Sequence, residues 1–118
     1  MSWYLSKLVF QIVCGDGEHT AQFDEQLRLI AATTKEEAFF KAQEIGRREE
    51  ESFYNHRRQL VHWQFINVCE VYQLHELING TEVYSKIEER DDAANYIHFI
   101  NQKAENILQS AHQFMDLL

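Results

Sequence analysis

The sequence predicts an α+β fold: a four-stranded, mostly antiparallel sheet with two helices, in the order β-β-α-β-β-α. Three observations lead to this prediction. Several segments have the alternating apolar pattern of strands, a capping signal at residues 34–37 begins a helix, and apolar residues recur every three or four positions up to the C-terminus. Strands that follow one another through turns, without a helix between each pair, favour antiparallel pairing.

Residues 3–14 and 24–32 are predicted to be the first two strands. Gly15-Asp16-Gly17 after the first strand is a turn signal, because glycine reaches positive φ without steric cost. The composition of residues 24–32 would also suit a helix. We favour a strand, because a clear helix start follows directly and because three residues alternate inward: Leu27, Leu29 and Ala31.

The first helix begins at Thr34, whose side chain can accept a hydrogen bond from an early backbone N–H, while Glu37 can reach back to the cap. Small residues on its buried stripe would let it lie close to the sheet. Gly46 should weaken it by about 1 kcal/mol relative to alanine. We expect the helix to end near residues 54–55, with this stripe: Ala38, Ala42, Ile45, Glu49 and Phe53.

Residues 60–74, LVHWQFINVCEVYQL, are predicted to form the central strand. Their apolar residues fall on both parities, which predicts that both faces of the strand are covered, since a strand with one wet face alternates more cleanly. Asn79-Gly80 is a tight-turn pair. Residues 81–88, TEVYSKIE, alternate and are predicted to be the fourth strand.

The last helix is predicted from Asp91-Asp92 to the C-terminus, with acidic residues at the positive end of the helix dipole. At ~1.5 Å per residue it would span ~40 Å, about the width of a domain of this size. Its apolar stripe either lies along the sheet or packs on a symmetry mate. The residues that would mediate self-association are Ile100, Ala104, Ile107, Ala111, Phe114 and Leu118.

The chain of 118 residues is predicted to be one domain, with the sheet and first helix in residues 1–90 and the second helix in residues 91–118. Its net charge of −8 makes nucleic acid an unlikely partner and favours a basic protein partner. It has neither a basic leader nor an apolar run of ~18 residues, so we expect no membrane association. With two cysteines, we expect a cytoplasmic protein with reduced thiols.

No catalytic motif is present, and no catalytic residue or cofactor is predicted. Zinc is a weak candidate ligand, because the cysteines and histidines are spaced more loosely than in zinc motifs; we favour core cysteines and surface histidines. This candidate metal set is Cys14, His19, Cys69 and His75. A candidate ligand pocket, with a histidine as acid/base, would use His62, Trp63, Phe65, Tyr72 and Tyr84, although aromatic residues on strands are more often core.

Several motifs in order resemble a family of small bacterial proteins catalogued as domain of unknown function 4288. They are the opening Trp3-Tyr4-x-x-Lys7-Leu8, the Glu25-x-Leu27-x-Leu29-Ile30 segment, the AATTKEEA helix start at 31–38, the run from Trp63 to Tyr72, and Gly80-Thr81-Glu82-Val83-Tyr84-Ser85. The resemblance covers about residues 3–88. It implies a bacterial cytoplasmic setting, and it brings no activity and no catalytic residues.

Two functional hypotheses follow. The first is a non-enzymatic protein-interaction module, in which helices of two subunits cover a homodimer's sheets. The alternative is a small-molecule-binding protein or enzyme with an aromatic-lined pocket on the sheet.

Overall fold

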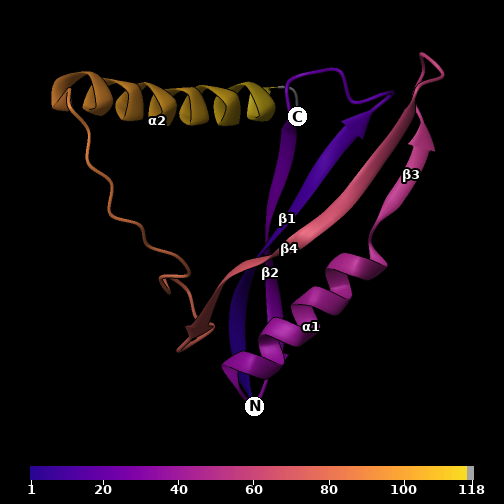
Figure 1. Cartoon of the computed structure of the whole chain (residues 1–118). Coiled ribbons are helices and arrows are strands. Elements are labelled where there is room, and N and C mark those ends of the chain that lie inside the picture. The colour runs from indigo at the N-terminus through magenta and orange to yellow at the C-terminus, as the bar shows by residue number, and fades with distance from the viewer. Residues whose placement is uncertain (117–118) are drawn as a thin grey trace. The chain divides into compact units, whose positions relative to one another are not determined.

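The computed structural model describes residues 1–116, and the chain divides into two compact units, Met1–Tyr84 and Ser85–Leu118. The first unit is a four-stranded antiparallel sheet in the order β2-β1-β4-β3, with one helix packed on it (Figure 1). Its elements are β1 (Ser2–Cys14), β2 (Gln22–Ala32), α1 (Lys35–Arg48), β3 (Glu51–Tyr54) and β4 (Leu60–Leu74). The predicted fold class and element order are therefore confirmed.

β1 and β2 form a long hairpin, paired without interruption from Ser2 with Ala32 to Ile12 with Gln22. The strand prediction for residues 24–32 is thus confirmed over the helix alternative. The predicted inward facing of Leu27, Leu29 and Ala31 is wrong, because they lie on the face away from the core, and Ile30 and Ala32 are the residues that face it. Gly15 and Gly17 after β1 have φ of 62° and 84°, which explains why glycine occupies this turn. The side chains of β1 alternate regularly, so every second residue, such as Leu8 and Phe10, faces the core.

β4 explains the mixed parity of residues 60–74. Its pairing with β1 shifts twice: Lys7 pairs with Glu70 but Leu8 with Val68, and Val9 pairs with Asn67 but Phe10 with Phe65. Each shift passes over one residue of β4, Cys69 and Ile66, so each is a one-residue bulge that moves the following side chains to the other face. Apolar residues of both parities therefore share the face toward α1: Val61, Trp63, Phe65, Val68 and Val71.

α1 packs on this face of the sheet. Its N-cap is Thr34, whose side chain accepts a hydrogen bond from the Glu37 N–H at 3.0 Å. The Glu37 carboxylate reaches back one residue further than the predicted cap, where it accepts bonds from the N–H and hydroxyl of Thr33. Ala38 and Ala42 are fully buried against the sheet, as their small size predicts. The core consists of Tyr4, Leu8, Phe10, Ile30, Ala32, Ala38, Ala42, Phe65 and Val68.

The predicted end of the first helix is wrong. α1 ends at Arg48, and Glu51–Tyr54 form the short strand β3, which pairs with Leu60–Trp63 of β4. The side chain of Asn55 accepts hydrogen bonds from the N–H groups of Arg57 and Gln59, which fixes the connecting turn. Phe53 and Tyr54 favour a strand, and this local hairpin prevails over the helical spacing of Phe53.

The predicted strand at residues 81–88 is also wrong: the segment has no regular secondary structure. A tight turn does form at Asn79-Gly80, where Gly80 has a φ of 89° and the Thr81 N–H donates to the Ile78 carbonyl. Beyond it, the Tyr84 ring makes an edge-to-face contact with Tyr72, with centroids 5.8 Å apart. The chain therefore turns onto a face of the sheet instead of pairing along the edge of β4.

The sheet face away from α1 carries no helix within the Met1–Tyr84 unit. An ion-pair cluster lies on it, with Lys7 Nζ 3.5 Å from Glu70 and 3.9 Å from Glu25. Around this cluster several large apolar side chains are 39–48% exposed: Trp3, Leu27, Leu29 and Tyr72. This unit therefore covers one face of its sheet and leaves much of the other apolar and exposed.

The second unit contains α2 (Ala93–Asp116), which confirms the predicted C-terminal helix. Asp92 caps it by accepting a hydrogen bond from the Asn95 N–H. α2 is the one helix of its unit within the described residues, so the unit offers no second element for its apolar stripe. No helix in the described part of the chain is long and apolar enough to cross a membrane.

Candidate functional site

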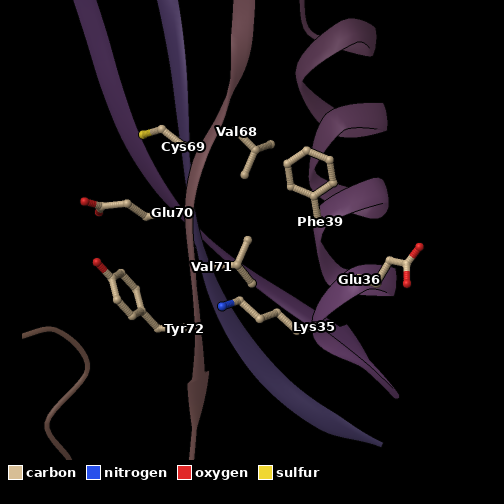
Figure 2. Close-up of a pocket in the computed structure, with 8 residues that line it drawn as sticks. All are labelled: Lys35, Glu36, Phe39, Val68, Cys69, Glu70, Val71 and Tyr72. Carbon is tan, nitrogen blue, oxygen red and sulfur yellow. The ribbon is translucent and has the colours of Figure 1, made fainter.

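An apolar groove of the first unit lies between the first turns of α1 and the bulged part of β4. Its volume is about 650 Å³. Figure 2 shows Phe39 on α1 facing Val68 and Val71 on β4, whereas Cys69, Glu70 and Tyr72 point away from the helix. The lining residues are Lys35, Glu36, Phe39, Val68, Cys69, Glu70, Val71 and Tyr72. The groove exists because α1 extends over a part of β4 that β3 does not reach.

The outer edge of β4 beside this groove is open. The Gly15 N–H donates to the Leu60 carbonyl, so the odd-numbered residues of the regular strand β1 turn their backbone groups toward β4. Their partners Glu70, Tyr72 and Leu74 therefore bond toward β1. The residues between them, Val71 and Gln73, turn their N–H and C=O groups outward.

The outward N–H groups along the earlier part of that edge have partners. Val61 and Trp63 pair with β3. The Phe65 N–H donates to a Glu50 carboxylate oxygen at 3.1 Å, and the Val68 N–H donates to the Asn67 side chain at 2.8 Å. Among the described residues, Val71 and Gln73 have no such partner, so the chain leaves its edge open beside the apolar groove.

Lys35 brings positive charge to the groove. Its side chain extends from the start of α1 toward Val71, while Glu36 points away (Figure 2). The positive end of the helix dipole lies at the same place. Glu37, two residues on, is already engaged by Thr33 and by Lys41, whose Nζ is 3.1 Å away. These bonds hold the pKa of Glu37 down at about 2, with the Thr33 hydroxyl as the largest cause.

The five residues predicted to line an aromatic pocket are divided between the two faces. Trp63 and Phe65 face α1, where both pack on Phe10, at ring centroid distances of 6.4 and 5.6 Å. His62 lies on the opposite face, where its Nδ1 is 2.6 Å from the Ser52 hydroxyl. Tyr72 and Tyr84 contact each other on that face. Tyr72 also lines the groove described above, together with residues that the sequence did not single out: Lys35, Phe39, Val68 and Val71.

The candidate metal set is likewise separated. Cys14 and His19 lie at the end of β1 that pairs with Val61, whereas Cys69 and His75 lie toward the other end of β4. Both ring nitrogens of His19 are engaged, because Nε2 accepts from the Cys14 N–H and Nδ1 donates to the Thr20 carbonyl. Within the described residues, no three His, Cys, Asp or Glu side chains are placed to hold a metal ion.

The shifted pKa values in the first unit do not indicate an acid/base site. Desolvation, followed by the nearby Glu70 carboxylate, raises the pKa of Tyr72. Desolvation opposes the charge of Lys7, but Glu25 and Glu70 outweigh it and raise that pKa too. The pKa of Glu37 is lowered. Each shift moves the pKa of the group further from neutral pH, whereas acid/base catalysis favours a pKa near the working pH.

Fold and groove together define a small α+β domain with one helix on one sheet face and an open strand edge. Residues 3–85 match the family model described as Domain of unknown function (DUF4288). The chain belongs to this family, as the sequence motifs had indicated. No curated protein and no solved structure matches the chain.

The residues predicted to mediate self-association lie on α2, as far as the structure describes them. Ile100 and Ile107 are 44% and 70% exposed, and Ala104 and Ala111 are exposed beside them. The side chain of Phe114 and the whole of Leu118 fall outside the described residues.

Proposed function

We propose that the chain is a non-enzymatic protein-interaction module that self-associates through the apolar stripe of α2. The observation that carries this proposal is a 24-residue helix with an apolar stripe and, within the residues that the structure describes, no second element in its own unit. Ile97, Ile100 and Ile107 are 58%, 44% and 70% exposed. An exposed stripe of this kind typically marks an interaction surface.

The arrangement of the stripe supports a helix-to-helix contact. Ile97, Ile100, Ala104, Ile107 and Ala111 follow one another at steps of three and four residues, the spacing that places residues on one seam between packed helices. A twofold dimer would bring two copies of this seam together. The net charge of −8 further supports a basic protein as an additional partner, since opposite charge accelerates encounter.

Size-exclusion chromatography with light scattering tests self-association. We expect the full chain to show twice its 14.1 kDa mass and the Ile100→Gln/Ile107→Gln variant to show a single chain mass. Glutamine keeps helix propensity and removes the apolar contact. The control Glu105→Gln/Asn106→Gln alters the other side of α2 and should leave the dimer intact. A monomeric full chain, or a dimer that the isoleucine variant retains, would refute the proposal.

A further inference from the structure

We propose that the groove beside Val71 and Gln73 binds an extended acidic peptide segment of a partner protein. The segment adds to β4 as a further strand, places an apolar side chain in the groove and offers a carboxylate to Lys35. This inference goes beyond self-association through α2, because it concerns a surface within Met1–Tyr84. It rests on three features of that surface: the open edge, the apolar floor and the positive charge of Lys35, which has no ion-pair partner among the described residues.

The open edge defines how the partner's backbone binds. Two outward residues of β4 pair with β3, and the N–H groups of the next two, Phe65 and Val68, are bonded to Glu50 and Asn67. The bulge at Ile66 lies in this occupied part of the strand, and the bulge at Cys69 directly follows it. Toward the C-terminal end of β4, beyond both bulges, the strand is regular, and there Val71 and Gln73 present outward N–H and C=O groups. An extended segment satisfies such groups by strand addition.

The floor of the groove defines which side chains the segment presents. In a strand added to β4, every second side chain points to the same face as Val71, which is the face that α1 covers. There it meets Val71, Phe39 and the buried Val68. A cavity of about 650 Å³ has room for an aliphatic or aromatic side chain. The preferred segment therefore carries apolar residues at alternate positions.

Lys35 defines the charge of the segment. It has no ion-pair partner within residues 1–116, and it stands at the helix end where a further positive charge is unfavourable. The carboxylates nearest in sequence do not compensate it, because Glu36 points away and Glu37 is bonded to Thr33 and Lys41. An incoming carboxylate gains from both Lys35 and the helix dipole.

Selection from a library of random octapeptides on phage, against the immobilised full chain, tests the proposal. We expect enriched peptides to alternate apolar residues and to carry an aspartate or glutamate. Labelled copies of the best peptide are then titrated by fluorescence polarisation. Lys35→Glu should weaken binding at least tenfold, and Lys35→Arg should preserve it. Gln73→Pro, which removes one outward N–H, should weaken binding at least tenfold, while Gln73→Ala should leave it within twofold.

Amide exchange in the unaltered chain gives a second readout that does not depend on the folding of a variant. Adding the selected peptide should slow exchange at Val71 and Gln73, with little change at Tyr72 and Leu74, which already bond toward β1. Failure to enrich any peptide, enrichment without acidic residues, equal binding to Lys35→Glu, or unchanged exchange at Val71 and Gln73 would each overturn the proposal. Light scattering on the free chain reports the α2 dimer separately.

Discussion

Gly46 offers a direct test of how closely α1 approaches the sheet. In an exposed helix, replacing glycine by alanine should stabilise the protein by about 1 kcal/mol. Here a Cβ on Gly46 would lie 2.7 Å from Cζ of Phe65 and closer still to two other ring atoms. That ring is 9% exposed and packs on Phe10, so it has little freedom to move.

We therefore expect Gly46→Ala to destabilise the protein. Overpacking of a core costs about 1–3 kcal/mol, and three overlapping ring atoms place this site toward the upper end. After the gain in helix propensity, the net loss should be about 1–2 kcal/mol. The melting temperature should fall by several degrees, since about 1 kcal/mol corresponds to about 4–8 °C in a domain of 60–100 residues.

Thermal and urea unfolding, followed by circular dichroism, measure this effect. In a Phe65→Leu background the ring is absent, so Gly46→Ala should become neutral or stabilising; this difference is the coupling energy of a double-mutant cycle. If Gly46→Ala raised the melting temperature of the otherwise unchanged chain, the close approach of α1 to Phe65 would be refuted.

Three further predictions concern the cap of α1 and the core. Thr34→Ala should lower the free energy of unfolding by about 1 kcal/mol in urea titrations, because it removes the N-cap acceptor; an unchanged midpoint would argue against the cap. The pKa of Glu37 is about 2 in the folded chain against 4.5 unperturbed, so its contribution is complete above pH 4.5 and disappears as pH falls toward 2. The stability difference between the unaltered chain and Glu37→Gln should therefore shrink over that window, and a constant difference would contradict this assignment. Ser6 is fully buried, and its hydroxyl has no hydrogen-bond partner among the described residues, so Ser6→Ala should stabilise the protein by about 1 kcal/mol; a lower urea midpoint would reveal a partner for that hydroxyl.

Local signals in the sequence predicted much of the fold. The capping residues at 34–37 and the alternation in residues 3–14 specify α1 and β1 through contacts within a few residues. The alternation of residues 81–88 failed as a guide, because a strand also needs a partner edge, and Tyr84 packs on Tyr72 instead. The sequence predicts the end of α1 too late, because no glycine or proline follows Arg48 to mark it.

The candidate site was less accessible to sequence analysis. The groove depends on where α1 passes over β4 and on how far β3 extends, and both are tertiary properties. Lys35 lies in a capping segment, where charged residues are ordinary. The mixed parity of residues 60–74 was the one available signal. By itself this pattern predicts two covered faces, whereas the bulges at Ile66 and Cys69 produce it.

The two bulges of β4 also affect which insertions and deletions the domain tolerates. A single-residue deletion at Ile66 would remove one bulge and leave Phe65, Asn67 and Val68 opposite Phe10, Val9 and Leu8, so Val68 would still face the core. A deletion at both sites would give a regular strand that is two residues shorter, with the same residues facing α1. Single-residue deletions at these two positions should therefore be tolerated, whereas a single deletion in the regular part of β4 would invert the facing of the residues on one side of it.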